Sequence, residues 1–143
     1  MTHDTFDEEA LLQCNCRAIR RAARLVTNLY DEALAPTGLR ATQFTLMGAV
    51  RLNESLSVNA LAEILDLDRT TTGKNVVPLE RLGYIDVKQS PSDSRSKVLT
   101  LTKAGNAILD QAYLLWQRAQ ATFEKANGKK NTAALREALS ILK

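Results

Sequence analysis

Apolar residues recur at alternating steps of four and three over 10–34, which is the spacing expected for one face of a long helix. The stripe consists of Leu12, Cys16, Ile19, Ala23, Val26, Tyr30 and Ala33. Pro36 and Gly38 follow it and are expected to end the helix in a turn. We therefore predict one continuous helix over 10–34, whose apolar seam suits packing against another long helix.

Three shorter helices are predicted next, at about 43–53, 58–66 and 69–82, because each range carries apolar residues on one helical face. Each range is preceded by a residue whose side-chain oxygen can cap a helix N-terminus: Thr42, Ser57 and Asp68. Only a tight turn over 66–68 separates the last two helices. Two short helices joined in this way predict a helix-turn-helix.

The apolar pattern changes from a period of 3.6 to a period of two after Gly83. Residues 84–88 and 97–101 are predicted to be strands, and the polar, turn-rich residues 89–96 between them complete a β-hairpin. A hairpin placed directly after a helix-turn-helix predicts a wing.

The C-terminal part of the chain is again helical in pattern. A second long helix is predicted over about 103–127, with Thr102 as its cap and Gly128 after its end. A last short helix is expected to follow Asn131 or Thr132. Its apolar face consists of Leu135, Leu139 and Leu142.

These elements together predict the fold class and the domain organisation. We expect a single domain over 1–143, mainly α with a small β-hairpin (α+β). Residues 42–101 form a winged helix-turn-helix lobe, and 10–34 with 103–143 form a helical base. The long apolar seam and the leucines of the last helix need a partner surface, so the base is expected to make a homodimer.

The distribution of charge is more informative than the net charge of +3. Residues 69–103 carry seven Lys or Arg and three acidic residues, whereas residues 1–13 carry four acidic residues and neither Lys nor Arg. Positive charge gathered on one segment is what binding to nucleic-acid phosphates requires. A basic face that is only solvated is the alternative explanation of this run.

The composition argues against several classes of protein. No apolar run approaches the ~20 residues needed to cross a bilayer. The first residues do not fit a signal peptide because they are acidic: Asp4, Asp7, Glu8 and Glu9. We therefore expect a cytoplasmic protein with no membrane partner. With His3 as the only histidine and two cysteines in all, we expect no zinc site, His-based catalytic triad, cofactor or enzyme activity.

The predicted helix over 69–82 carries the strongest chemical signal. Thr72, Val76 and Leu79 share one face and are expected to face the core. The rest of the first two turns presents hydroxyls, cations and an amide, which suit entry into a DNA major groove. The candidate DNA-binding residues on this helix are Arg69, Thr70, Thr71, Lys74 and Asn75. A surface helix whose threonines only cap its start is the alternative, and the hairpin behind the helix weighs against it.

Arg95 lies near the tip of the predicted wing and is a further candidate DNA-binding residue. Its side chain can reach a narrow minor groove, where the negative potential is strongest. Asp93 is expected either to hold the Arg95 side chain or to shape the turn. A polar hairpin tip is commonly just solvated. Arg95 is a candidate because a helix-turn-helix precedes the hairpin.

The order of these elements resembles the MarR family (multiple antibiotic resistance regulators). The resemblance covers about 10–143 and rests on the joint spacing of four segments, 68–72, 79–85, 93–95 and 101–105. It implies a homodimer on double-stranded DNA whose long terminal helices interlock. It also implies repression that a small phenolic or other aromatic ligand, or oxidation, relieves. The ligand cleft in the family lies between the helical base and the winged lobe. Gly73 stands where members often carry Thr.

Cys16 is a candidate redox residue. The organic-peroxide sensors of this family carry a reactive cysteine at a similar place, and Tyr30 matches a second tyrosine of those sensors. Arg17 follows Cys16 where the sensors have an aromatic residue, and Arg20 stands where they carry a tyrosine. A neighbouring arginine can lower the pKa of a thiol, whereas a buried cysteine commonly acts as a small apolar side chain. The residues leave both roles open.

The spacing of the two cysteines predicts how they lie relative to each other. Residues two apart on a helix point about 200° apart around its axis. If both cysteines lie on the helix over 10–34, Cys16 faces the apolar seam and Cys14 faces away from it. We therefore expect that they do not bridge each other in the folded protein.

The sequence favours a ligand-responsive repressor that binds a pseudo-palindromic operator as a homodimer. A thiol-based oxidative-stress sensor that uses Cys16 is an alternative within the same class. A winged-helix protein-interaction module that does not bind DNA is an alternative from another class. The clustered charge of 68–74 and of the wing weighs against that module, because protein interfaces tend to exclude such clusters.

Overall fold

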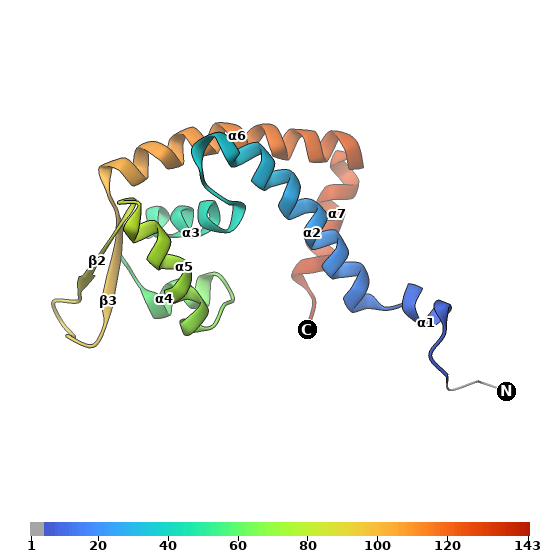
Figure 1. Ribbon diagram of the computed structural model, residues 1–143, viewed down its shortest axis with the longest axis horizontal. Helices are drawn as coiled ribbons and strands as arrows, with labels where there is room; N and C mark the ends of the chain where they lie inside the picture. Colours follow the sequence, from blue (N-terminus) through green and yellow to red (C-terminus); the bar gives the residue numbers. More distant parts are fainter. Residues whose placement is uncertain (1–4) are drawn as a thin grey trace.

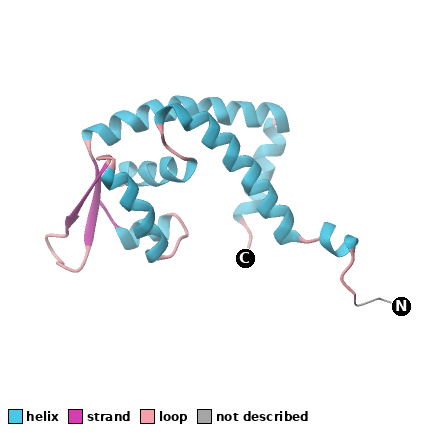
Figure 2. Ribbon diagram, viewed as in Figure 1, coloured by secondary structure: helices cyan, strands magenta, loops and turns pink. Residues whose placement is uncertain are grey.

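The computed structural model describes residues 5–143, so His3 and Asp4 lie outside the described residues. Its elements follow one another along the chain as α1 (Glu8–Leu12), α2 (Asn15–Leu34), the 3-10 turn η1 (Ala35–Thr37), α3 (Ala41–Leu52), β1 (Leu56–Ser57), α4 (Val58–Ile64), α5 (Arg69–Arg81), β2 (Ile85–Gln89), β3 (Lys97–Leu101), α6 (Lys103–Asn127) and α7 (Lys129–Ser140). The chain is mostly helical with one small sheet (Figure 2). The predicted fold class is confirmed.

The predicted single helix over 10–34 is wrong, because the chain is interrupted between α1 and α2. Cys14 has an extended backbone with ψ of 110°, and its Sγ accepts a hydrogen bond from the backbone N–H of Arg17 at 3.4 Å. A new helix, α2, therefore begins directly after Cys14. The apolar period cannot reveal this break, because it does not register a side chain that competes for a backbone N–H.

The predicted caps are confirmed at three helices. Side-chain oxygens of Ser57, Asp68 and Thr102 each accept a backbone N–H three residues ahead, at 3.0, 2.7 and 2.9 Å. These helix starts are recognisable in the sequence because donor and acceptor are three residues apart.

Two predicted helix starts need correction. Thr42 does not cap α3, because the helix begins at Ala41 with Arg40 as its N-cap. Asp31 of α2 accepts the backbone N–H of Ala41 at 2.7 Å. The last helix starts at once after Gly128 rather than after Asn131 or Thr132. The φ of 86° at Gly128 turns the chain sharply from α6 into α7.

The wing belongs to a three-stranded antiparallel sheet in the order β1-β3-β2. The predicted hairpin is confirmed, with Ile85 opposite Leu101 and Gln89 opposite Lys97. The short β1 adds a third strand, in which Leu56 pairs with Leu99. This pairing ties the start of α4 to the base of the wing.

One apolar core joins the winged lobe to the helical base. Leu34 of α2, Met47 of α3, Leu79 of α5, Leu99 of β3 and Leu109 of α6 all belong to it and are buried. The core covers the end of α2 and the first half of α6. Figure 1 shows that α1, the start of α2 and α7 lie at the far end of the molecule from the wing.

Gly105 fixes the angle at which α6 leaves the sheet. A Cβ at this position would lie 2.1 Å from the carbonyl oxygen of Tyr84, so no larger residue fits. The same turn is held by Thr102, whose Oγ1 donates to the carbonyl oxygen of Gly83 at 2.5 Å. These contacts attach the lobe to the start of α6.

Candidate nucleic-acid interface

The helix α5 buries the face that its sequence pattern predicts. Thr72, Val76 and Leu79 are buried, and the hydroxyl of Thr72 donates to the carbonyl oxygen of Asp68 at 2.8 Å. This hydrogen bond satisfies the one polar side chain on the buried face. The rest of α5 is free to present Arg69, Thr70 and Lys74, which are all exposed.

Two hydrogen bonds from Thr71 to Asp68 stabilise the start of α5. The two carboxylate oxygens of Asp68 accept the backbone N–H and the hydroxyl of Thr71, each at 2.7 Å. These two hydrogen bonds hold the pKa of the Asp68 carboxyl below its ordinary value of 3.8, since they favour the charged form. Thr71 is therefore engaged within the protein, which leaves Thr70 as the free hydroxyl at the helix start.

A polar hollow of about 460 Å³ lies between the start of α5 and the wing. It brings together three of the predicted residues, Arg69 and Thr70 from α5 and Arg95 from the wing. The remaining lining residues are Ser57, Val58, Asn59, Gly73, Ser96 and Lys97. The hollow thus collects three cations on one side of α5, a charge that suits a phosphate.

Lys97 and Asn59 are residues of this hollow that the sequence analysis did not identify. Lys97 lies at the start of β3, and its exposed position in an alternating strand is a signal that could have indicated it. Asn59 lies in the first turn of α4 and carries no such signal. Gly73 has open space around it, because a Cβ there would meet no atom within 4 Å.

Asp93 shapes the turn of the wing, which was one of its two expected roles. Its Oδ1 accepts the backbone N–H of Arg95 at 3.0 Å, and its Oδ2 accepts the hydroxyl of Ser96 at 3.3 Å. The ion pairs found among residues 5–143 do not include one between Asp93 and Arg95. The Arg95 guanidinium is therefore exposed beside the hollow.

The other predicted residues of α5 lie away from this hollow. Lys74 is exposed and Asn75 is partly buried. Asn75 lines a separate hollow of about 300 Å³, together with Arg40 and Thr42 from the start of α3. The structure therefore divides the predicted DNA-binding residues between two sides of α5.

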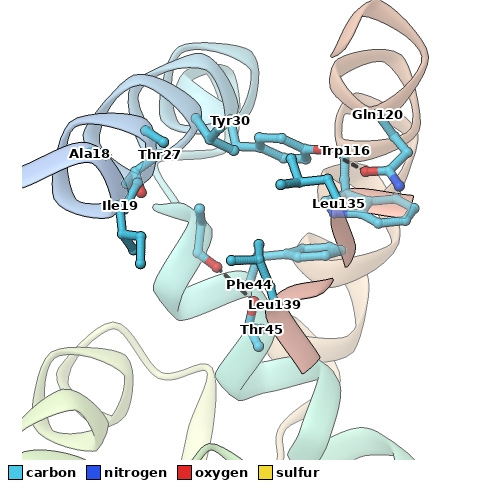
Figure 3. A pocket seen from close by; sticks show the side chains of 14 residues that line it. Ala18, Ile19, Thr27, Tyr30, Phe44, Thr45, Trp116, Gln120, Leu135 and Leu139 are labelled. Atoms are coloured by element: carbon cyan, nitrogen blue, oxygen red, sulfur yellow. Dashed lines mark hydrogen bonds between the residues drawn. The ribbon is translucent and has the colours of Figure 1, made fainter. Parts of the chain in front are cut away.

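A large apolar cavity of about 600 Å³ lies between α2, α3, α6 and α7 (Figure 3). Phe44 of α3 stacks on Trp116 of α6 with ring centroids 5.9 Å apart. The hydroxyl of Tyr30 donates to the side-chain oxygen of Gln120 at the edge of the cavity. Partial burial and the charge of Glu124 raise the pKa of Tyr30, although Arg136 opposes the shift.

The lining of this cavity is uncharged in the described part of the chain. It consists of Ala18, Ile19, Ala22, Ala23, Val26, Thr27, Tyr30, Ala41, Phe44, Thr45, Trp116, Gln120, Leu135 and Leu139. Aromatic walls with a few hydrogen-bonding groups are typical of sites for small organic molecules, and the volume lies within their usual range of roughly 300–1,000 Å³.

The cysteines do not lie as their spacing predicted. Cys16 is exposed, whereas Cys14 is partly covered and lies outside α2 as its N-cap. Both border one hollow of about 370 Å³ with Leu11, Arg17, Arg20 and Arg24. The expectation that both cysteines lie on one continuous helix is wrong, because Cys14 precedes α2 as its N-cap. Both cysteines are free, without a disulfide between them.

Residues 5–143 contain no membrane-spanning helix and no metal-binding cluster. No helix there combines the length and the apolar character that crossing a membrane would require. No group of three or more His, Cys, Asp or Glu side chains lies close enough together to hold a metal ion.

Comparisons with known proteins point in one direction. A family model described as the MarR family matches residues 37–96. The structure is similar to that of the M. tuberculosis transcriptional regulator MosR in complex with DNA, with 33% identity, a TM-score of 0.75 and coverage of 90% of this chain and 97% of that one. It is also similar to the transcriptional repressor CouR bound to a DNA duplex, with 27% identity, a TM-score of 0.84 and coverage of 96% and 97%.

A curated relative from Bacillus subtilis (strain 168) is named as an organic hydroperoxide resistance transcriptional regulator. It is 27% identical over 107 residues, which are 75% of this chain and 73% of that protein.

Proposed function

This chain belongs to the MarR family of transcription regulators, and we propose that it is a repressor that binds a pseudo-palindromic operator as a homodimer and is released by a small ligand. The observation that carries the proposal is the hollow beside α5, where Arg69, Arg95 and Lys97 converge from the helix and the wing. The structures of MosR and CouR, to which this chain is similar, contain bound DNA, which supports the proposal.

The proposed contacts follow from the placement of α5 and the wing. Arg69, Thr70 and Lys74 enter the major groove, where Arg pairs with guanine edges and Thr contacts a base or a phosphate. Arg95 reaches the adjacent minor groove from the wing. Thr71 acts through Asp68 by holding the start of α5, and Asp93 holds the wing turn.

The experiment that tests this function is selection of bound duplexes from a random pool by the full-length protein. We expect a pseudo-palindrome with half-sites about one helical turn apart, roughly 10 base pairs from centre to centre. Affinity for the selected site should fall steeply with salt, because phosphate contacts release counterions. A protein-interaction module would select no sequence and would show no such salt dependence.

The homodimer is supported by apolar side chains that the single chain leaves exposed. Leu12, Ile19 and Leu25 near the N-terminus, and Leu135 and Leu139 on α7, each expose between 46% and 65% of their surface. Exposed apolar groups gathered at one end of a molecule mark an interaction site. We place the dimer interface on 10–34 and 103–143, within the single domain 1–143 whose lobe is 42–101.

The proposed ligand is a small aromatic or phenolic molecule in the cavity between α2, α3, α6 and α7. The cavity lies between the helical base and α3 of the lobe, so an occupant there can shift one against the other. An uncharged lining favours a neutral ligand, because a buried carboxylate without a cation is costly. Trp116 is the only tryptophan and lines the cavity, so its fluorescence reports occupancy.

Matched probes test the ligand proposal. We expect salicylamide to quench Trp116 and to release operator DNA at lower concentration than salicylate does. Stronger quenching and release by the anion would contradict the neutral character of the site.

A thiol switch is a second candidate function, favoured by the hollow in which Cys14 and Cys16 meet three arginines. Cys16 is exposed, so an oxidant can reach its sulfur. The Cys16 thiolate would attack an organic hydroperoxide, giving the sulfenic acid and the alcohol after protonation of the leaving alkoxide. The Bacillus subtilis relative named for hydroperoxide resistance supports the same oxidant.

Cumene hydroperoxide added to the DNA-bound protein tests the switch. The second candidate predicts release from DNA by the parent and no release by Cys16→Ser, with Cys14→Ser as the matched variant. Release that persists in Cys16→Ser would exclude Cys16 as the sensor.

A further inference from the structure

A second polar hollow flanks α5 on the side opposite the wing. It has a volume of about 300 Å³ and is lined by Arg40, Thr42, Gln43 and Leu46 of the α3 segment and by Asn75 and Pro78 of α5. Arg40 and Thr42 are exposed. The ion pairs found among residues 5–143 involve Arg51 and Arg136 but not Arg40.

The position of this hollow follows from the geometry of α5. Each residue turns a helix by about 100°, so Gly73 and Asn75 project from opposite flanks when Thr72 and Val76 face the core. Gly73 borders the hollow beside the wing, and Asn75 borders the hollow beside α3. The exposed Lys74 therefore lies between two polar hollows, and Thr70 borders the one beside the wing.

The DNA major groove has a matching arrangement. It is about 12 Å wide and is bordered by the phosphates of both strands, and a helix with its side chains is about 10–12 Å across. A helix seated in the groove therefore brings one flank toward each backbone. In such a seating, the wing hollow would face one row of phosphates and the α3 hollow the other.

We propose that Arg40, Thr42 and Asn75 bind a phosphate of the DNA backbone across the major groove from the wing. This inference rests on the proposed operator binding and extends it to residues of α3. The Arg40 guanidinium supplies the charge, and Thr42 and Asn75 supply neutral hydrogen-bond donors. Gln43 is engaged at the helix start instead, since its side-chain oxygen accepts the backbone N–H of Arg40 at 3.0 Å. Asn75 thereby contributes affinity and register rather than base preference.

The first test measures the salt dependence of operator affinity by fluorescence anisotropy. Arg40→Ala should weaken binding about tenfold, equally on operator variants, and should lower the steepness of the salt dependence by about one counterion. Arg51→Ala is the matched control on the same helix, because the Arg51 guanidinium pairs with Asp110 of α6 at 2.5 Å. The control should bind like the parent.

The outcomes separate this inference from the function on which it rests. A parent protein without salt-dependent operator binding would contradict both. Normal binding by the parent with an unchanged slope for Arg40→Ala would overturn only the contact proposed here. Equal loss in Arg40→Ala and Arg51→Ala would also overturn it, since it would reflect net charge alone.

The second test locates the phosphate. Duplexes with a single neutral methylphosphonate at successive positions should include one that weakens the parent but causes no further loss in Arg40→Ala. The phosphate coupled to Lys97 of the wing hollow should lie on the other side of the major groove. Arg40→Lys, which keeps the charge, should restore most of the salt dependence. Additive losses at every methylphosphonate position would contradict the proposal.

Discussion

The winged lobe and the far end of the helical base differ in how much of their apolar side chains they bury. The lobe shares one closed core with the end of α2 and the first half of α6, in which Leu61, Leu79 and Leu99 have no exposed surface. At the far end, α1 has no buried residue and α7 buries only Thr132. The shared core is closed within one chain. At the far end, by contrast, apolar side chains stay exposed because no second surface covers them.

This difference also separates the proposed functions. The lobe presents cations on a rigid, locally capped helix, which suits a surface that must hold its shape against DNA. The far end and the cavity beside it lie where a second chain or a ligand can change the packing. A regulator needs both properties in one molecule, and here they lie at opposite ends of α6 (Figure 1).

The largest expected effect comes from removing the C-terminal helix. Deletion of 131–143 should abolish the dimer, giving a monomer or an aggregate in light scattering, because most of α7 is lost. Leu139→Glu should act in the same direction, since it places a charge on the apolar face. Lys130→Glu puts the same carboxylate on a polar position of α7 and should leave a dimer. A well-folded monomer of the full-length protein would contradict the proposed interface.

The next effect is on the stability of the lobe. Leu79→Ala should lower the free energy of unfolding by about 2–5 kcal/mol, because it leaves a cavity in a closed core. Leu82→Ala removes the same side chain at the end of the same helix, where 55% of the surface is exposed. Urea titrations should show a much smaller loss for Leu82→Ala. Similar losses of unfolding free energy in Leu79→Ala and Leu82→Ala would mean that Leu79 does not lie in a closed core.

Smaller effects are expected from substitutions of the proposed DNA-binding side chains, which are exposed and should leave folding unchanged. Arg95→Ala and Lys74→Ala should each weaken operator binding by about tenfold, on all sequences alike. Arg69→Ala should also change the preferred base at one position of each half-site, at a cost of about 1–3 kcal/mol. Repeating the duplex selection with each variant distinguishes the two kinds of loss. Parent-like binding by both Arg95→Ala and Lys74→Ala would refute the groove assignment.

The smallest effect concerns the cap of α5 at acidic pH. The folded state lowers the pKa of Asp68, so the charged cap stabilises the fold above the ordinary value of 3.8. That contribution is lost as the pH falls through the lower folded pKa. The melting temperature of the parent should therefore exceed that of Asp68→Asn near neutral pH, and the two should converge in acid. A constant difference across this range would contradict the role of the Asp68 charge.

The sequence by itself determined most of the winged lobe. The period of three and four at Thr72, Val76 and Leu79 identified the buried face of α5, and the caps at Ser57, Asp68 and Thr102 were recognisable from neighbouring residues. The candidate residues on α5 and the wing were also identified from this pattern. These features are local, because a helix start or a strand alternation involves residues only a few positions apart.

Only the tertiary structure decided what depends on contacts between distant segments. It supplied Asp31 of α2 as the acceptor for the backbone N–H of Ala41 at the start of α3, separated α1 from α2 at Cys14, and brought both cysteines to one hollow. It also brought Arg69, Thr70 and Arg95 to one hollow with Lys97, and Asn75 to another with Arg40. A periodic pattern reports which side of one helix is apolar, but not which residues of another element face it, because that choice is made by packing.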